Sequence, residues 1–351
     1  MLRTDDQSMP RTGHRPSFAA DPAFRRDVLN GLAARPRMIP PCWFYDRYGS
    51  ALFEEITMLP EYYVTRTERS LLQSAAAEIA ALVGPGRAVV EFGSGSCSKT
   101  PILLTALNPA AYVPIDISGG MLTESATNIS TIFRELAIHV IEGDFTKAVR
   151  LPPWVERLPR LGFFPGSTIG NFLVPEAVNL LRSMASTLGG GSMLLIGVDR
   201  IKDQSILLPA YNDAAGVTAA FNRNILHRIN RELRGSIPVD AFHHLARWND
   251  EEARIEMHLK AKRDVEFAVD GHFFRMAEGE TIHTENSLKY GPRDVGVLLR
   301  AGGWSPTAMW TDQDELFTVI LAQETATLSG TWDGPQSERG RSEHSRCLRA
   351  I

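Results

Sequence analysis

The stretch AVVEFGSGSCSKTPILL, residues 88–104, decides the fold. It opens with an apolar segment, 88–92, that predicts a buried strand, and it continues as a helix from about Lys99. Gly93 and Gly95 lie at the junction, where glycine lets the backbone turn tightly and lets a ligand approach the main chain. A strand, a glycine loop and a helix in this order are typical of the first unit of a ligand-binding α/β sheet.

Strands and helices alternate in the sequence that follows this loop. Continuous apolar runs predict further strands at 111–115, 138–141, 161–164 and 192–198. Helical patterns fill the gaps at 101–107 and 175–188. This alternation predicts an α/β fold with a doubly wound, Rossmann-like sheet that is mostly parallel.

The alternation is interrupted after about residue 200. A long helical run covers 216–233, and strand-like segments follow at 253–259 and 264–269. The first pattern then resumes with a helix at 293–301 and two strands at 305–311 and 316–321, which predict an antiparallel end to the sheet. We expect the insertion and the helical N-terminal region, from about 21 to 81, to build a second unit over the sheet.

The residues of the glycine loop favour one class of ligand over two others. A phosphate-binding P-loop and a dinucleotide fingerprint both require a glycine where this sequence has Ser98. Glu91, at the end of the strand, would also bring a carboxylate close to the phosphates of such ligands. S-adenosylmethionine carries an ammonium and a sulfonium instead, and Glu91 is a suitable counter-charge for them. A glycine turn that binds nothing is the remaining alternative.

Acidic residues at the ends of the next two strands favour S-adenosylmethionine. Asp116 follows the glycines by about 20 residues, where a carboxylate can accept hydrogen bonds from both ribose hydroxyls. Asp144 and Phe145 end the next strand, and they suit the exocyclic amine and the face of an adenine ring. We therefore predict a sheet that binds S-adenosylmethionine.

One amide residue is the first candidate for binding the methyl acceptor. Asn171 follows the fourth predicted strand, and ligands of such sheets bind outside the carboxyl ends of the strands. An amide there can orient an amine or a carboxylate without adding charge, although Asn171 is an equally good cap for the next helix.

At this point the sequence resembles a known family, the L-histidine Nα-methyltransferases of the ergothioneine pathway. The resemblance covers most of the chain, from about 40 to 321. It rests on nine strings in order: WFYD, LPEYYVTRTE, EFGSGSCSKT, YVPIDIS, GDFT, FPGSTIGN, AYNDAAGVTAAFN, IEMHL and HTENSLKY. It implies an enzyme that trimethylates the α-amino group of histidine to hercynine, the first step of ergothioneine biosynthesis.

The resemblance also implies the roles of particular residues. The cofactor is expected on the loop and the strand-end residues, with Glu91 and Gly95 added from the residues themselves: Glu91, Gly93, Gly95, Lys99, Asp116, Asp144 and Phe145. The histidine is expected on six residues: Tyr63 (with Tyr62 as the alternative), Asn171, Tyr211, Met257, Glu285 and Ser287. Tyr45 lines the same pocket and is the candidate catalytic residue.

The expected chemistry needs alignment more than reactive side chains. The amine attacks the methyl carbon directly, so nitrogen, carbon and sulfur must lie in line. Tyr45 or a water takes the proton of the amine, or the neutral amine is the form that binds. Tyr45 and Phe53 offer aromatic faces to the growing cationic head. Glu285 and Ser287 suit the two ring nitrogens of histidine, since a site built for both leaves buried polar groups unpaired with another substrate.

Two other functions remain open from the sequence. One is a methyltransferase for another aromatic amino acid, such as tryptophan. The other is a protein that binds S-adenosylmethionine without catalysis.

The resemblance and the interruption together predict the domain organisation. Residues 1–16 form a disordered lead-in, and 326–351 form a flexible tail. Residues 17–63 and 200–285 form a discontinuous substrate-binding domain, and 64–199 with 286–325 form the S-adenosylmethionine-binding domain.

Composition narrows the possible partners. The formal net charge is −4 and basic residues are spread along the chain, which argues against a nucleic-acid partner. No apolar run reaches the length of a signal peptide or a membrane span, and the three cysteines favour a reducing compartment. The adjacent His243 and His244 lack the neighbours of a metal site. We expect a cytoplasmic monomer with small-molecule substrates, no membrane partner and no metal.

Overall fold

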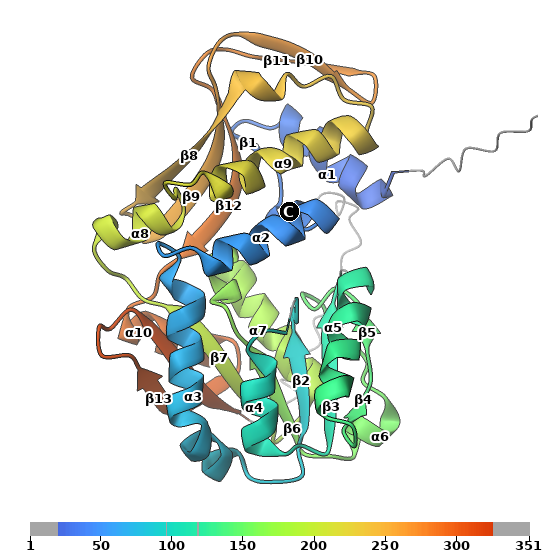
Figure 1. The fold of residues 1–351 in the computed structure, drawn as a ribbon, viewed down its shortest axis with the longest axis vertical. Helices are drawn as coiled ribbons and strands as arrows, with labels where there is room; N and C mark the ends of the chain where they lie inside the picture. Colours follow the sequence, from blue (N-terminus) through green and yellow to red (C-terminus); the bar gives the residue numbers. More distant parts are fainter. Residues whose placement is uncertain (1–19, 96, 118, 326–351) are drawn as a thin grey trace, which may run out of the picture.

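The computed structural model describes residues 20–95, 97–117 and 119–325, so the expected lead-in 1–16 and tail 326–351 lie outside them. Figure 1 shows the chain as two layers, each built around a β-sheet, with the larger sheet below and the smaller one above. Helix α2 (Arg47–Met58) lies at the level where the two layers meet.

The larger sheet confirms the predicted Rossmann-like topology. Its strands run in the order β13–β14–β7–β6–β2–β3–β4, and β5 also pairs with β3. The strands from β2 to β7 pair in parallel, whereas β14 pairs antiparallel with both β7 and β13, as predicted for the end of the sheet. Their bounds are β2 (Ala88–Phe92), β3 (Ala111–Asp116), β4 (Ala137–Ile138), β5 (Ile141–Glu142), β6 (Arg160–Phe164), β7 (Met193–Asp199), β13 (Trp304–Thr311) and β14 (Phe317–Glu324).

Helices cover both faces of this sheet because its central strands are apolar on both sides. Val89 of β2 packs into one core and its neighbour Val90 into the other, since successive side chains of a strand point to opposite faces. Each fully buried side chain of this size contributes roughly 1.5–3 kcal/mol. One face carries α3 (Tyr63–Val83), α4 (Thr100–Leu107) and α5 (Gly119–Ile132), and the other carries α6 (Pro153–Glu156), α7 (Val174–Leu188) and α10 (Pro292–Ala301).

Helix α7 shows how the local sequence fixes an element. The Glu176 carboxylate accepts a hydrogen bond from the Leu173 N–H at 2.9 Å, which satisfies one of the free donors at the start of the helix. Pro175 lies in the first turn, where its missing N–H costs nothing. The helix ends before Gly189, whose φ of +74° is one that glycine adopts without strain.

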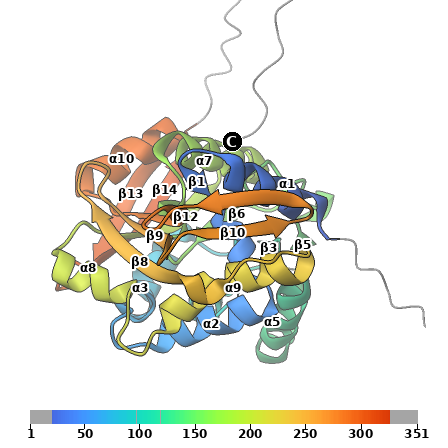
Figure 2. The same ribbon diagram turned by 90° about the horizontal axis from the view of Figure 1, so that it is seen from above.

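The smaller layer combines the N-terminal region with the insertion. Its four-stranded sheet has the order β1–β12–β9–β8, and the antiparallel pair β10–β11 extends beyond it. Helix α9 crosses the face of this sheet that looks toward α2 (Figure 1, Figure 2). The bounds are α1 (Pro22–Ala33), β1 (Arg37–Met38), the 3₁₀ turn η1 (Pro41–Phe44), α8 (Gln204–Ala210), α9 (Val217–Glu232), η3 (Val239–Ala241), β8 (Phe242–Asn249), β9 (Arg254–Ala261), β10 (Val265–Val269), β11 (His272–Met276) and β12 (Thr281–Leu288).

The sequence pattern did not identify several of these strands. β12 has the sequence TIHTENSL, and β8 has FHHLARWN, so neither shows a clean alternation of apolar and polar residues. Both are partly buried all the same, because their polar side chains face other parts of the protein instead of solvent. The strand predicted at 138–141 also appears as two shorter strands, β4 and β5.

The two layers meet closely where β12 passes the turn η2 (Thr168–Asn171). A Cβ atom on Gly170 would lie 2.7 Å from the Leu288 carbonyl oxygen, so only glycine permits this approach. The domain boundary expected between 285 and 286 falls inside β12, which continues to Leu288 as one strand. The contact brings Asn171, at the end of η2, beside the strand that carries Glu285 and Ser287.

Candidate active site

The glycine loop leaves its main chain open at the carboxyl edge of the larger sheet. Gly93 has φ +69° and Gly95 has φ +48°, a left-handed conformation that favours glycine. A Cβ atom on Gly95 would meet no other atom within 4 Å, and one on Gly93 would lie 3.3 Å from the ring of Phe145. The loop therefore borders a space that has the Phe145 ring on one side.

The two predicted strand-end acids lie at this same edge. The Asp116 carboxylate ends β3 and accepts a hydrogen bond from the Gly95 N–H at 3.1 Å. Asp144 follows β5 and pairs with Lys147 at 2.8 Å. Burial raises the pKa of Asp144, but hydrogen bonds from Lys147 and Thr146 outweigh burial and hold the pKa below its usual value. Asp144 is thus ionised at neutral pH.

The structure gives Glu91 a different role from the one expected. Its carboxylate is 1% exposed and accepts hydrogen bonds from Thr100 at 2.8 Å and from Tyr112 at 2.5 Å. Burial raises the pKa of Glu91 to about 7, against the lowering effect of those hydrogen bonds. The carboxylate therefore ties the glycine loop to α4 and β3, and it does not reach the space in front of the loop.

Lys99 is also held by the protein itself. Its ammonium pairs with the buried Glu68 carboxylate of α3 at 2.5 Å. Glu68 accepts a second bond, from the Gly166 N–H after β6, at 2.8 Å. Lys99 and Glu68 together fasten the helix α3 to two loops at the carboxyl edge of the sheet, which is a positioning role.

A small, partly open pocket, called the cavity below, lies between the smaller sheet and the helices α2 and α9. Aromatic rings form much of its wall. Tyr45 packs against two of these rings, with its centroid 5.6 Å from that of Phe53 and 5.8 Å from that of Phe221, in edge-to-face arrangements. The residues around it are Phe53, Ile56, Tyr62, Ala210, Tyr211, Thr218, Phe221, Met257 and Glu285.

Of the two candidate tyrosines at 62 and 63, Tyr62 lines this cavity. The Tyr63 hydroxyl points elsewhere and donates to the Asp199 carboxylate at 2.8 Å. The two side chains diverge because Tyr63 begins α3 and faces β7, whereas Tyr62 precedes the helix and packs against the ring of Tyr211 at 6.3 Å. Of the two tyrosines, Tyr62 is therefore the one that a ligand in this cavity would meet.

The candidate catalytic residue Tyr45 keeps its proton in this environment. Burial raises the pKa of its hydroxyl well above the usual value, and the nearby Glu285 carboxylate raises it further. A phenolate is unfavourable there. Tyr45 is thus suited to orient a ligand through its hydroxyl and its ring, and it is a poor acceptor for the proton of an amine.

Glu285 brings the one carboxylate among the residues that line the cavity. It lies opposite Met257 in the β12–β9 pairing, so both side chains project on the same face of the sheet. Burial raises the pKa of Glu285 to about 7, while the positive charge of Lys289 lowers it. The carboxylate is therefore poised to be ionised or protonated near neutral pH.

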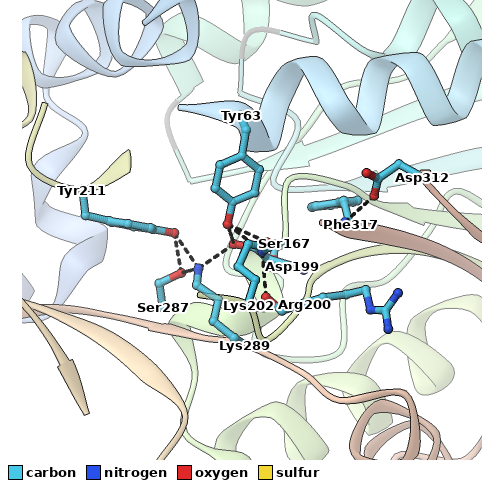
Figure 3. Close-up of polar contacts among 10 residues, drawn as sticks. All are labelled: Tyr63, Ser167, Asp199, Arg200, Lys202, Tyr211, Ser287, Lys289, Asp312 and Phe317. Atoms are coloured by element: carbon cyan, nitrogen blue, oxygen red, sulfur yellow. Dashed lines mark hydrogen bonds and ion pairs between the residues drawn. The ribbon is translucent and has the colours of Figure 1, made fainter. Parts of the chain in front are cut away.

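A buried cluster of charges stands behind the cavity (Figure 3). Lys289 and Lys202 both pair with Asp199, at 2.7 and 2.5 Å. Burial raises the pKa of Asp199, but the attraction of the two lysines outweighs burial and lowers the pKa. Lys289 also donates to the hydroxyls of Tyr211 at 2.8 Å and Ser287 at 2.7 Å, and these two hydroxyls lie 2.7 Å apart.

This cluster was not identified from the sequence, although one signal was present. Glu285, Ser287 and Lys289 alternate in the string HTENSLKY, which is the spacing of one face of a strand. Asp199 and Lys202 gave no comparable signal, because their proximity to β12 depends on how the two sheets pack. The same holds for Phe221 in the wall of the cavity.

Two other features concern metals and membranes. The ring nitrogens of His244 are engaged by Asn222 and by the Tyr211 carbonyl, each at 2.8 Å. Among the residues that the structure describes, no three His, Cys, Asp or Glu side chains gather as a metal ion would require. In the same part of the chain, every helix is too short or too polar to span a bilayer.

Comparison with known proteins gives the family. A family model described as "Histidine-specific methyltransferase, SAM-dependent" matches residues 24–324. The chain is 43% identical over 310 residues to histidine N-alpha-methyltransferase of Mycolicibacterium smegmatis, covering 87% of this chain and 96% of that protein. The same enzyme of Mycobacterium tuberculosis is 42% identical over 306 residues, covering 86% and 94%. Ergothioneine biosynthesis protein 1 of Neurospora crassa is 28% identical over 304 residues, covering 84% of this chain and 34% of that protein. The chain therefore belongs to the family of histidine-specific, S-adenosylmethionine-dependent methyltransferases.

Proposed function

We propose that this methyltransferase transfers methyl groups from S-adenosylmethionine to the α-amino group of L-histidine, up to the trimethylated product hercynine in ergothioneine biosynthesis. The observation that carries the proposal is Glu285, a half-buried carboxylate that lines an aromatic cavity, with the Ser287 hydroxyl, which pairs with that of Tyr211, two residues further along the same strand. Such polar groups favour a ring that can hydrogen-bond with them. The relatives in two mycobacteria support the same substrate.

The residues at the edge of the larger sheet fit S-adenosylmethionine. The open main chain at Gly95 and the ring of Phe145 beside Gly93 leave room for a flat base and a ribose. Asp116 suits the ribose hydroxyls, and Asp144 suits the amino group of adenine. When bound, this cosubstrate supplies an electrophilic methyl group on a cationic sulfur. Glu91 and Lys99 hold the loop in place from behind.

The smaller layer is the proposed substrate-binding domain. Glu285 and Ser287 face the imidazole ring, and Met257 lies opposite Glu285 in the neighbouring strand. Tyr62 and Asn171 would hold the amino and carboxylate groups, and the Tyr211 hydroxyl acts with that of Ser287. The two layers meet beside η2, so an amino acid held by β12 lies next to the carboxyl edge of the larger sheet.

Catalysis on this proposal comes from alignment in a dry, aromatic pocket. The rings of Tyr45, Phe53 and Phe221 exclude water and face the amine, which must lie in line with the methyl group. Because its pKa is raised, the Tyr45 hydroxyl stays protonated. It can donate a hydrogen bond, but it does not act as the base that removes the proton of the amine. The neutral amine is then the form that reacts, after its proton passes to water.

The decisive experiment is mass spectrometry of the purified protein with S-adenosylmethionine and each of the twenty amino acids in separate reactions. Trimethylated histidine alone is the expected product. Methylation of tryptophan or another aromatic amino acid in its place would overturn the substrate assignment and keep the cofactor assignment. Binding of S-adenosylmethionine without any methylated product would make the protein a non-catalytic binder.

We further propose a cytoplasmic monomer that has no nucleic-acid partner. The net charge of −4 and the absence of an extended basic run in the sequence support this. A mass of one chain by light scattering at micromolar concentration is the expected result, and a stable dimer would contradict it.

A further inference from the structure

The ammonium of Lys289 has all its hydrogen-bonding capacity in use. It is fully buried and contacts three oxygens, those of Asp199, Tyr211 and Ser287, at 2.7 to 2.8 Å. A lysine ammonium has three N–H donors and no acceptor, so each of these oxygens accepts one hydrogen bond from Lys289. Figure 3 shows the three contacts converging on this one nitrogen, between the acid of β7 and the two hydroxyls near the cavity.

These contacts limit what the two hydroxyls can offer to a ligand. The Tyr211 and Ser287 oxygens each accept a hydrogen bond from Lys289, and one of the two hydroxyls donates a hydrogen bond to the other across 2.7 Å. Of their two protons, one remains for an outside acceptor, and of their four lone pairs, one remains for an outside donor. The pair therefore acts as a unit whose geometry depends on the lysine.

The cluster also carries one more positive charge than negative charge. Asp199 carries one negative charge against the two positive charges of Lys202 and Lys289, and all three side chains are almost completely buried. The remaining positive charge has a counter-charge in Glu285, which lies four residues before Lys289 on the same strand. Lys202 contacts Tyr63 and Asp199 instead and touches neither hydroxyl of the pair.

We propose that Lys289 is a positioning residue of the substrate pocket, which holds the Tyr211 and Ser287 hydroxyls as a fixed pair and supplies the positive charge that balances the Glu285 carboxylate. This rests on the proposed function, because histidine is the ligand that the pair and Glu285 would share. A neutral imidazole has one N–H for the Glu285 carboxylate and one bare nitrogen for the spare proton of the pair. An indole ring lacks that second acceptor, so Lys289 contributes to the choice of histidine over tryptophan.

Glu285 is surrounded by three tyrosines and one lysine, Lys289, and the lysine is the charged group among them. Tyr45, Tyr62 and Tyr211 approach it from the other elements around the cavity. Burial raises the pKa of all three tyrosines well above the usual value, so they stay neutral across the working range of pH. Lys289 is the cation acting on Glu285, and its loss leaves the buried carboxylate without a counter-charge.

The test compares Lys289→Met with Lys202→Met. Each substitution leaves Asp199 with one lysine, so the two variants keep a balanced ion pair and differ in which lysine remains. The dissociation constant of histidine is measured by calorimetry in the presence of S-adenosylhomocysteine, from pH 5.5 to 8.5. We expect Lys289→Met to weaken histidine binding roughly tenfold or more at pH 8. Because Lys289 lowers the pKa of Glu285, Lys289→Met should also raise the pH at which histidine binding is lost on acidification. Lys202→Met should leave that pH unchanged.

A double-substitution cycle tests the contact with the hydroxyl pair. Ser287→Ala should weaken histidine binding in the wild-type background but add little to Lys289→Met, because the pair is already lost there. In the Lys202→Met background the effect of Ser287→Ala should remain complete. Lys289→Gln, which keeps a donor without the charge, replaces Lys289→Met if the latter fails to bind S-adenosylhomocysteine.

Two outcomes would overturn the proposal at different levels. If wild-type protein methylates no histidine, the proposed function fails and this inference fails with it. If wild-type protein methylates histidine but the Lys289 variants bind it with the wild-type pH dependence, only the role of Lys289 is wrong. If the losses of histidine affinity in Lys289→Met and Ser287→Ala multiply in the double variant, the two residues act independently. That result would reject the coupling of Lys289 to the Tyr211–Ser287 pair.

Discussion

Single residues in the cavity combine an apolar wall with a small number of polar groups that define the ligand. Glu285 is the clearest case, because its carboxylate lines the cavity and burial raises its pKa to about 7. Glu256 lies one position before Met257, the cross-strand neighbour of Glu285, and has the opposite environment. Burial raises the pKa of Glu256, but bonds from Asn249, His258 and two arginines outweigh burial and lower it to well below the usual value. Glu256 is satisfied within the protein, whereas Glu285 is left available for a ligand.

Glu285→Gln should weaken histidine binding with little effect on the cofactor. Glutamine keeps the shape of the side chain but loses the charge, so the KM for histidine should rise roughly tenfold or more. In the wild type this KM should fall as pH rises through about 7, because the carboxylate ionises there. In Glu285→Gln the KM for histidine should no longer change with pH through the ionisation of residue 285. Steady-state kinetics from pH 6 to 8.5 measure both effects, and the exposed Glu135→Gln is the matched control. An unchanged KM in Glu285→Gln would remove Glu285 from the substrate site.

Tyr45→Ala should affect the last methyl transfer most. The product of that step carries a permanent charge, which an aromatic face stabilises by about 0.5–2 kcal/mol. Tyr45→Phe keeps the ring and should still give trimethylated histidine, whereas Tyr45→Ala should accumulate mono- and dimethylated products. Mass spectrometry of the product distribution measures this, with the exposed Tyr48→Ala on α2 as the control. Equal distributions in all variants would contradict a role for Tyr45 in methyl transfer.

At the scale of elements, the loop between β2 and α4 depends on backbone conformation. Gly93 and Gly95 have positive φ, and the loop is anchored from behind by Glu91 and from the side by the Asp116 carboxylate. The helix α4 begins at Thr100, whose hydroxyl bonds to Glu91. These contacts hold Gly95 and the start of α4 in place, and such preorganisation lowers the entropy cost of binding.

Gly93→Ala should reduce cofactor affinity more than it reduces stability. A left-handed conformation costs a non-glycine residue roughly 1–2 kcal/mol, and the new methyl group would press on Phe145 at 3.3 Å. We expect S-adenosylhomocysteine to bind roughly tenfold more weakly by calorimetry. Gly190→Ala is the control, since Gly190 lies in a turn after α7 and a Cβ there meets nothing within 4 Å. Equal affinities in the two variants would show that the loop tolerates a side chain at residue 93.

At the scale of the whole molecule, the charged cluster joins parts that are distant in sequence. Asp199 ends β7 of the larger sheet, Lys289 follows β12 of the smaller one, and Tyr63 begins α3. The Tyr290 N–H also bonds to the Asp199 carbonyl at 2.9 Å. Because the cluster lies at the junction of the two layers, its charges affect how the layers are held together as well as the pocket.

Asp199→Asn should destabilise the fold strongly at neutral pH. It removes the carboxylate that the buried Lys202 and Lys289 both contact, and breaking a buried ion pair in this way costs about 3–5 kcal/mol in comparable cases. The folded-state pKa of Asp199 is lowered, so its contribution is complete above the ordinary carboxyl pKa and is lost only as pH falls below that range. Urea unfolding at pH 7 measures the loss, with the exposed Asp314→Asn as the control. A change below 1 kcal/mol in Asp199→Asn would contradict the cluster's role at the junction.

The sequence alone predicted the order of strands and helices around the glycine loop, and it predicted that the loop and the strand-end acids share one edge of the sheet. These follow from local patterns: apolar runs, glycines and strand-end acids, whose positions along the chain already imply a shared edge. The family resemblance added the expected substrate residues, of which Tyr211, Met257 and Glu285 line one cavity.

The tertiary structure alone decided where individual side chains point. Glu91 turns inward because Thr100 and Tyr112 satisfy it, and Tyr62 replaces Tyr63 at the cavity because Asp199 draws the Tyr63 hydroxyl away. Lys289 meets Asp199 only when the end of β12 packs near the end of β7. Each of these depends on contacts between segments far apart in the chain, and a local pattern carries no information about such contacts until the two layers are packed together.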